Sequence, residues 1–173
     1  MRAFLTALAL AMTALPAAAA LPAGGKAPNF VTSAAMGGKA FRLDLKKQLR
    51  KGPVVLYFFP KAFTKGCTLE ARAFSEAEPE FRKAGARVIG LSADDIGTLQ
   101  KFSVEECRNA FAVGRASPEL IRDYKVVWKE QKGLTTRTSY VIDRSGRIVM
   151  VHDDLDWSQH VAKTLAAVKA LKR

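Results

Sequence analysis

The stretch Val54-Val55-Leu56-Tyr57-Phe58-Phe59 is a continuous run of six apolar, β-branched or aromatic residues, and it ends at Pro60. Polar and apolar residues do not alternate along it, which is typical of a strand buried on both faces of a sheet. Strands of this kind occur in α/β proteins, where helices cover both sides of the sheet. The run therefore predicts the central strand of an α/β fold.

A helical pattern follows this strand from Cys67 onward. Apolar residues recur every four positions and predict one buried stripe, made of Leu69, Ala73, Ala77 and Phe81 and widened by Phe74. Cys67 itself lies outside this predicted stripe. Pro79 is expected to kink or end the helix, because proline lacks the amide hydrogen that the helical ladder uses.

The rest of the chain continues the alternation of strands and helices. Expected strands cover residues 86–91, 110–113, 139–142 and 148–152, and the last two form an antiparallel hairpin through the turn at 143–146. Expected helices run from the capping residues 92–95 to about 106, over 119–124 after Pro118, and over 155–171 with one face made of Val161, Leu165, Val168 and Leu171. An extended segment at 27–31 and a turn at Gly37-Gly38 come before the first strand. This order predicts a mixed sheet with helices on both sides, as in a thioredoxin-like fold.

The length of 173 residues fits one domain with its own core, which we expect over residues 21–173. With 49% hydrophobic and 25% charged residues, the composition is that of a globular protein and excludes wholesale disorder or collagen-like repeats. The chain has two cysteines, no Cys-x-x-Cys pair and two histidines, which leaves too few ligands for a structural zinc site. Any cysteine chemistry therefore depends on one or two residues.

Residues 1–20 have the three-part order of a secretory signal peptide. Arg2 supplies the positive charge, residues 4–15 the apolar stretch, and Ala18-Ala19-Ala20 the small residues of a cleavage site. The apolar stretch is shorter than the about 20 residues that cross a bilayer, which argues against the alternative of an uncleaved anchor. We expect an exported chain that begins near Leu21, has no transmembrane segment and, in a Gram-negative cell, is periplasmic.

The chain has a net charge of +12, and removal of Arg2 with the leader lowers it to +11. A field of this sign attracts polyanions. The Lys and Arg residues are scattered along the sequence and do not form runs. We therefore favour a solvated basic surface over a dedicated nucleic-acid site, and expect no nucleic-acid partner.

Cys67 follows the first buried strand by about eight residues and stands beside Gly66 at the start of the predicted helix. A helix N-terminus presents unpaired amide donors and the positive end of the helix dipole, and both favour a thiolate over a thiol. The alternative is a buried structural cysteine, the commoner case for an isolated one. Against it, Cys67 lies outside the apolar stripe and follows the polar turn Thr64-Lys65-Gly66.

The residues around Cys67 resemble a known family. The segment Pro60-Lys61-Ala62-Phe63-Thr64-Lys65-Gly66-Cys67 is similar to the peroxiredoxin active-site pattern Pro-x-x-x-Thr-x-x-Cys. Cys67-Thr68-Leu69-Glu70 resembles the Cys-Thr-x-Glu of the peroxiredoxin Q, or bacterioferritin comigratory protein, branch. Segments 25–30, 54–59 and 137–143 also resemble the family, the last of them the strand with its second active-site arginine. The resemblance covers the chain from about residue 25 to its end and implies a thioredoxin-like fold and a thiol peroxidase.

The resemblance also implies roles for individual residues. Cys67 would attack a hydroperoxide and become a sulfenic acid. Thr64 would place its hydroxyl on the thiolate and the peroxide, and Pro60 would shield the sulfur from water. Arg137 would donate to both reacting groups. No metal, haem or flavin cofactor is implied.

Two further positions are expected in the substrate-binding part of the site. Gly66 contributes an amide at the helix start, and we expect Glu70 to complement the helix dipole and also to brace an arginine. Simpler readings exist for the residues above, since Thr64 could be only a helix cap and Arg137 only a solvated charge. The histidines lie outside the motif, and we expect both at the surface or in the hairpin: His152 and His160.

The chain departs from the resembled branch in the position of the thiol that would resolve the sulfenic acid. Many members of the resembled branch carry it five residues after the peroxidatic cysteine, where this chain has Arg72. Cys107, forty positions after Cys67, is the other cysteine, and some members resolve from the corresponding helix. An intramolecular Cys67–Cys107 disulfide is therefore our favoured hypothesis, and it would require the first turn around Cys67 to unwind. The alternative is a one-cysteine mechanism in which an external thiol attacks Cys67 directly.

Other functions remain possible on the same fold. A thiol-disulfide oxidoreductase needs Cys-x-x-Cys, but Glu70 stands three positions after Cys67. A cationic binding module with a vestigial cysteine is the alternative that is not an enzyme. For the peroxidase we expect a hydroperoxide substrate and an external thiol or thioredoxin-like reductant. Resemblance to the branch favours a monomer.

Overall fold

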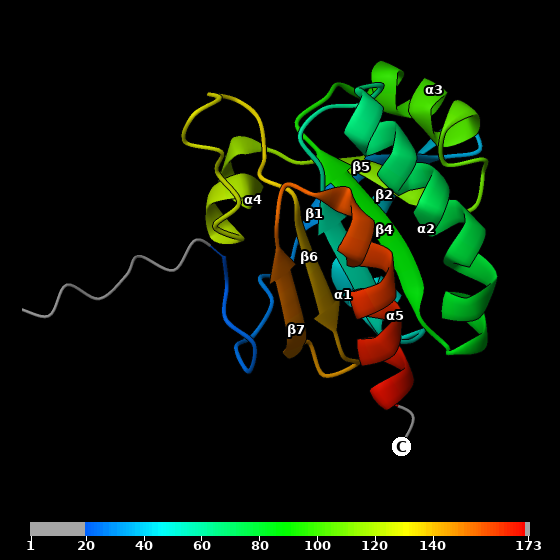
Figure 1. Cartoon of the computed structure of the whole chain (residues 1–173), viewed down its shortest axis with the longest axis vertical. Coiled ribbons are helices and arrows are strands. Elements are labelled where there is room, and N and C mark those ends of the chain that lie inside the picture. The colour runs from blue at the N-terminus through cyan, green and yellow to red at the C-terminus, as the bar shows by residue number, and fades with distance from the viewer. Residues whose placement is uncertain (1–19, 172–173) are drawn as a thin grey trace, which may run out of the picture.

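The computed structural model describes residues 20–171, so the predicted signal peptide lies outside the described residues except for Ala20. One mixed sheet of seven strands runs through this part of the chain, in the order β2-β1-β5-β4-β3-β6-β7 (Figure 1). The strands are β1 Val31–Met36, β2 Lys39–Asp44, β3 Val54–Phe58, β4 Arg87–Ser92, β5 Ala112–Arg115, β6 Thr138–Ile142 and β7 Ile148–Asp153. The predicted α/β class is confirmed.

Helices cover both faces of this sheet (Figure 1). They are α1 Leu45–Leu49, α2 Lys65–Lys83, α3 Ile96–Glu105, α4 Pro118–Asp123, the short 3-10 helix η1 Trp157–Gln159, and α5 His160–Ala170. The helices α1 and α4 pack into one apolar cluster, and α2, α3 and α5 pack into a second cluster on the other face. The core is thus two apolar layers separated by the sheet.

β3 is buried on both faces, as its sequence predicts. Leu56 and Phe58 belong to the first cluster, while Val55 and Tyr57 belong to the second. β3 pairs in parallel with β4 and antiparallel with β6. Its carboxyl end therefore points toward the start of α2 from the centre of the molecule.

The structure corrects two expectations about α2: the helix does not end at Pro79, and its buried face matches the predicted stripe only in part. The helix continues past Pro79 to Lys83, and its last turn is held by the buried ring of Phe81. Its buried face includes Cys67, Ala71 and Phe74, whereas Leu69 is exposed. The predicted stripe is right at Phe74 and Phe81, but it missed the first turns of this face because Glu70 puts a carboxylate there and not a hydrocarbon side chain. Cys67 therefore does not lie outside the buried stripe.

The remaining elements mostly follow their capping signals. The side chains of Asp95 and Ser117 accept the first amide bonds of α3 and α4, and β6 and β7 form the predicted hairpin. The last helix begins five residues later than expected, at His160, because Asp156 caps η1. Of the predicted face, Val168 is buried and Val161 and Leu165 are partly buried against the second cluster, whereas Leu171 is exposed. The buried residues of α5 also include two polar ones, His160 and Thr164.

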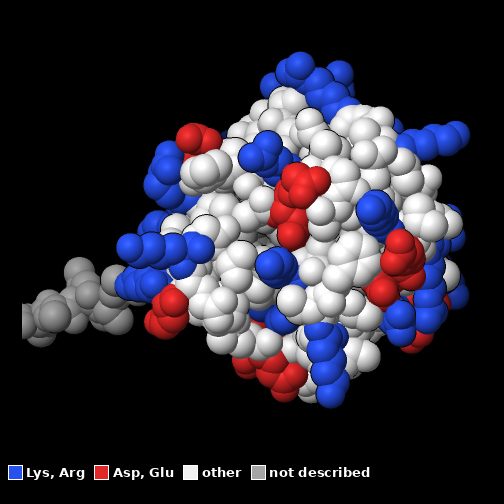
Figure 2. All heavy atoms as spheres, turned by 90° about the horizontal axis from the view of Figure 1, so that it is seen from above, with Lys and Arg blue, Asp and Glu red and all other residues white. Residues whose placement is uncertain are grey.

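The surface charge is mixed on the face shown in Figure 2. Lys and Arg side chains form separate groups there, with Asp and Glu between them. In residues 20–171 no helix is both long and apolar enough to cross a membrane.

Candidate active site

The chain leaves β3 through the buried Pro60 and enters α2 at Lys65. Cys67 is the third residue of α2, its thiol is free, and only 1% of its surface is exposed. A sulfur at this position faces the unpaired amides of the first helical turn. Phe63, just before the helix, has a left-handed backbone with a φ of 62° and an exposed ring.

Arg137 brings a guanidinium to this sulfur from a distant part of the sequence. Its Nη2 lies 3.6 Å from Cys67 Sγ, its Nη1 pairs with Glu70 Oε2, and its Nε donates to the Leu155 carbonyl at 2.8 Å. The residue is buried, so the reading of Arg137 as a solvated charge is wrong. Burial lowers the pKa of Arg137, but the charges of Glu70 and Cys67 outweigh it and raise the pKa overall. The cation is therefore fixed in place and permanently charged.

Glu70 is fully buried one helical turn after Cys67. Burial raises the pKa of Glu70 to about 8, although Arg137 acts in the opposite direction. Its Oε2 pairs with Arg137, whereas its Oε1 has no hydrogen-bond partner among the described residues. Of the two roles expected for Glu70, contact with the arginine is present in the structure.

Thr64 and Gly66 frame the start of α2. Thr64 occupies the N-cap position without a side-chain cap bond, and its hydroxyl donates to the Lys61 carbonyl at 2.9 Å. A Cβ on Gly66 would lie 3.1 Å from Arg137 Nη2. Glycine at this position therefore leaves room for the guanidinium beside the sulfur.

Cys107 follows the end of α3 and is fully buried in the same apolar cluster as Cys67. Its thiol is free, and burial, with a smaller contribution from Glu106, raises its pKa. Two ion pairs attach its turn to α2: Arg72 Nε to Glu106 Oε2 at 2.7 Å, and Arg108 Nη1 to Glu76 Oε1 at 3.3 Å.

Sequence reasoning missed His160 and Ser139, which lie behind the arginine. His160 is fully buried, and its Nδ1 lies 3.7 Å from Glu70 Oε1 and 2.8 Å from Ser139 Oγ. The prediction that His160 lies at the surface is wrong. The spacing of His160, Thr164 and Val168 on one helical face was the available signal, but two of these residues are polar and the apolar pattern does not include them.

Within residues 20–171 no group of three His, Cys, Asp or Glu side chains is placed to hold a metal ion. The groups that meet at Cys67 are instead an amide-rich helix start, a guanidinium and a carboxylate. This arrangement can stabilise an anionic sulfur and can donate hydrogen bonds to an oxygen that approaches it.

The sequence profile of the AhpC/TSA family matches residues 23–151. The chain belongs to the AhpC/TSA family. Its relatives there include the chloroplastic peroxiredoxin Q of Oryza sativa subsp. japonica, which is 30% identical over 95% of this chain and 81% of its own length. Peroxiredoxin Bcp of Escherichia coli K12 is 33% identical over 81% of this chain and 90% of its own length. The chain is therefore a thiol peroxidase of the peroxiredoxin Q and Bcp type.

A solved structure supports the fold of this peroxiredoxin. The bacterioferritin comigratory protein of Xanthomonas campestris, studied for its alkyl peroxide reduction activity, superposes with a TM-score of 0.71 at 28% identity. The match covers 82% of this chain and 92% of that chain. The predicted thioredoxin-like fold is confirmed.

Proposed function

We propose that this peroxiredoxin reduces hydrogen peroxide or organic hydroperoxides, with Cys67 as the peroxidatic nucleophile and Arg137 as the donor to its sulfur. The observation that carries the proposal is the 3.6 Å contact between Arg137 Nη2 and Cys67 Sγ at the start of α2. The alkyl peroxide reduction of the Xanthomonas campestris relative supports organic hydroperoxides as substrates. A thiol-disulfide oxidoreductase is not favoured, because Glu70 takes the place of the second cysteine that its motif needs.

In the first step the Cys67 thiolate attacks the terminal peroxide oxygen. The S–O bond forms as the O–O bond breaks, Cys67 becomes a sulfenic acid, and the departing oxygen takes a proton to leave as water or alcohol. A helix start and a nearby guanidinium favour the thiolate over the thiol, but a more stable thiolate is also a weaker nucleophile. With a Brønsted slope of about 0.4–0.5, the loss of nucleophilicity cancels nearly half of the logarithmic gain in thiolate. Most of the acceleration must therefore come from donors to the departing oxygen, which we assign to Arg137 and the amides at the helix start.

The residues around the sulfur have supporting roles in this proposal. Pro60 shields the sulfur from water, and Thr64 orients thiolate and peroxide through its hydroxyl, which must then turn from the Lys61 carbonyl. Gly66 leaves space for the guanidinium and offers an amide to the substrate. Glu70 holds Arg137 in the orientation that reaches the sulfur.

We propose that Cys107 resolves the sulfenic acid. Its sulfur would attack Cys67–SOH, form a disulfide and release water, and two external thiols or a dithiol thioredoxin-like protein would then supply the two electrons and two protons that restore both thiols. Two features support this role: both sulfurs belong to one buried cluster, and Cys107 precedes two residues with left-handed backbones, Arg108 and Asn109. Such residues mark a turn under strain at the end of α3, where unwinding costs less than within a helix. The alternative is direct attack on Cys67 by an external thiol.

Mass spectrometry after one equivalent of peroxide tests both assignments. The reduced wild type is expected to lose two hydrogens, and the loss should be absent in Cys107→Ser, which should keep a sulfenic or sulfinic adduct. Cys67→Ser should show neither product. A wild type that carries only the oxygen adduct would establish the one-cysteine mechanism and overturn the role of Cys107.

The compartment and assembly are also proposals. We infer that residues 1–20 direct export, that 21–173 form a single periplasmic domain, and that it acts as a monomer without a nucleic-acid partner. The order of charge, apolar stretch and small residues supports the first point. Cell fractionation, the mass of the mature chain and size-exclusion chromatography test these points, and an intact leader on a cytoplasmic protein would refute the first.

A further inference from the structure

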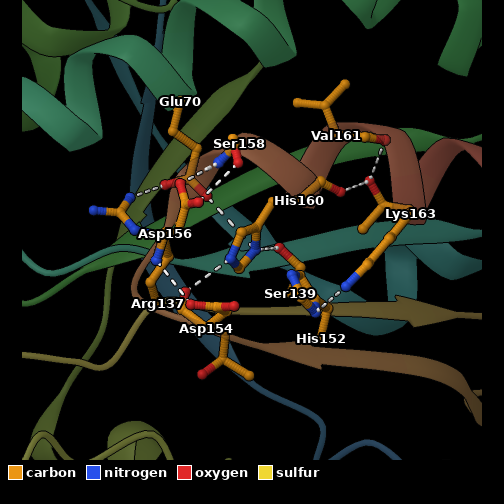
Figure 3. Close-up of polar contacts among 12 residues, drawn as sticks. Glu70, Arg137, Ser139, His152, Asp154, Asp156, Ser158, His160, Val161 and Lys163 are labelled. Carbon is orange, nitrogen blue, oxygen red and sulfur yellow. Dashed lines mark hydrogen bonds and ion pairs between the residues drawn. The ribbon is translucent and has the colours of Figure 1, made fainter.

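A buried polar network extends from Arg137 to His160 (Figure 3). Glu70 links the two, since its Oε2 pairs with Arg137 Nη1 and its Oε1 lies 3.7 Å from His160 Nδ1. That distance is too long for a hydrogen bond, and Oε1 has no other partner among the described residues. Glu70, His160 and Ser139 are all fully buried, so the contact is not part of a solvated surface.

The hydrogen bonds of His160 fix which ring nitrogen carries the proton. Nε2 lies 2.9 Å from the Asp154 carbonyl oxygen, which can only accept, so Nε2 is the donor. Burial lowers the pKa of His160 to about 4, which leaves the ring neutral at physiological pH. Nδ1 is then an unprotonated acceptor that receives the Ser139 hydroxyl at 2.8 Å. Its lone pair and Glu70 Oε1 face one another as two acceptors with no proton between them.

The charges around Cys67 explain the effect of a proton bound between Glu70 Oε1 and His160 Nδ1. One guanidinium, Arg137, contacts two groups that can be anions, the sulfur of Cys67 and the carboxylate of Glu70. If both were ionised, one negative charge would stay unmatched in a buried site, which is costly. A proton on Glu70 Oε1 removes that charge and supplies a donor for His160 Nδ1.

We propose that His160 is a positioning residue for the thiolate of Cys67, because it accepts a hydrogen bond from a proton held on Glu70 Oε1. The inference rests on the proposed role of Cys67. When Cys67 loses its proton, Glu70 Oε1 binds one, and no bond between heavy atoms forms or breaks. Cys67, Glu70 and Arg137 keep a summed charge of zero before and after. Ser139 releases Nδ1 by rotation of its hydroxyl.

Other charged groups also face His160. Arg137 and the ring of His152, whose centroid is 4.5 Å away, disfavour a proton on His160. The carboxylate of Asp154 favours one, and Asp156 lies close enough for its own pKa to be lowered in part by His160. These groups stay the same in both His160 variants below, so the difference between those two variants reports on the two ring nitrogens, and the control His152→Asn measures the effect of the neighbouring ring.

Two substitutions distinguish the roles of the two ring nitrogens of His160. In His160→Asn, the amide oxygen takes the place of the Nδ1 acceptor, while the donor to Asp154 is lost. In His160→Gln, the amide nitrogen takes the place of the Nε2 donor, while the acceptor that faces Glu70 is lost. If the role of His160 were only structural, the two variants would behave alike, or His160→Asn, which loses the hydrogen bond to Asp154, would be the more defective.

The readout is the thiolate fraction of Cys67 as a function of pH, followed by ultraviolet absorbance and alkylation rate in a Cys107→Ser background. We expect His160→Gln to shift this curve upward by about one pH unit, which lowers the fraction about tenfold below the midpoint, since an unneutralised nearby charge shifts a proton equilibrium by about one pKa unit or more. His160→Asn and the control His152→Asn should stay within about twofold of the parent. In a Glu70→Gln background, where no charge remains to neutralise, His160→Gln should have no effect.

Equal effects of His160→Gln and His160→Asn, no effect of either, or an effect that persists with Glu70→Gln would each overturn the proposal. If the His160 variants fail to fold, Ser139→Ala provides the test, since it frees Nδ1 for Glu70 and should keep or raise the thiolate fraction. A fall in Ser139→Ala would contradict the proposal. The titration of Cys67 needs no peroxide, so it tests the role of His160 independently of peroxidase activity. A wild type that fails to consume peroxide would reject the peroxidatic role of Cys67 without affecting the titration.

Discussion

Arg137 Nη2 and Cys67 Sγ lie 3.6 Å apart, although 70 positions separate the two residues. The register of the sheet explains this contact. β3 and β6 are antiparallel neighbours, with Phe58 opposite Thr138, so the residue before β6 lies at the edge where the chain leaves β3 for α2. The central strand and the hairpin strand therefore deliver nucleophile and cation to one place.

Arg137→Lys should slow the reaction of Cys67 with hydrogen peroxide about 100-fold or more. Lysine keeps the charge but cannot contact Cys67, Glu70 and the Leu155 carbonyl together, and loss of one preorganised donor costs about 10²–10³ in rate. Stopped-flow kinetics of peroxide consumption measures the effect. Arg144→Lys, at an exposed position, is the control, and equal rates in the two variants would reject the special role of Arg137.

Gly66→Ala should lower the same rate constant while the protein stays folded. The new Cβ would lie 3.1 Å from Arg137 Nη2 and force the guanidinium to move by a few tenths of an ångström. Gly25→Ala, where the nearest atom is the Pro22 carbonyl oxygen at 3.4 Å, is the matched control. An unchanged rate in Gly66→Ala would show that the guanidinium position is not critical.

Stability should depend on pH through Glu70 and His160, with opposite signs. The pKa of Glu70 is raised by burial to about 8, so between its unfolded pKa of about 4.3 and 8 the folded protein binds more protons and stability falls as pH rises. The pKa of His160 is lowered by burial to about 4, so between 4 and about 6.5 stability rises with pH. The two effects on stability oppose each other at acid pH. Above about pH 6.5 only the effect of Glu70 is left, so stability falls as pH rises to about 8.

Thermal unfolding across this range tests the two assignments separately. Glu70→Gln should remove the loss of stability above about pH 6.5, and His160→Gln should make the protein gain stability as pH falls from about 6.5 to 4.5. Profiles that stay parallel to wild type in both variants would contradict the assignments.

Tyr57→Phe should raise the melting temperature. The Tyr57 hydroxyl is buried without a hydrogen-bond partner among the described residues, and burial raises its pKa, so removal of the hydroxyl should stabilise the fold by about 1 kcal/mol, or about 2–4 °C. Tyr140→Phe should do the opposite, because that hydroxyl donates to the Tyr124 carbonyl at 2.7 Å and accepts from the Leu21 amide at 3.2 Å. Differential scanning calorimetry compares the two, and destabilisation in Tyr57→Phe would mean that its hydroxyl has a partner in solution.

Much of the fold follows from local signals in the sequence. The burial of β3 on both faces, the caps at Asp95 and Ser117, and the β6–β7 hairpin were all predictable because each depends on residues close together in the chain. The β1–β2 hairpin was visible only as its Gly37-Gly38 turn. Most residues of β2 are exposed, so the strand has no apolar alternation to detect.

The inner part of the site was not predictable in the same way. Glu70 and His160 are polar residues on buried helical faces, and their burial makes sense only with the partners Arg137 and Ser139, which come from elsewhere in the chain. An apolar pattern excludes such residues from the core. The motif around Cys67 was readable because its residues are contiguous, whereas the polar network behind Arg137 depends on how α2, β6 and α5 pack.

The most direct test of the account is the second-order rate constant for hydrogen peroxide, measured on the reduced wild type, Cys67→Ser and Cys107→Ser. We predict that the first oxidation step is lost in Cys67→Ser and proceeds in Cys107→Ser at a rate close to wild type. Peroxide consumption by Cys67→Ser at the wild-type rate would contradict the assignment of Cys67 as the peroxidatic thiol.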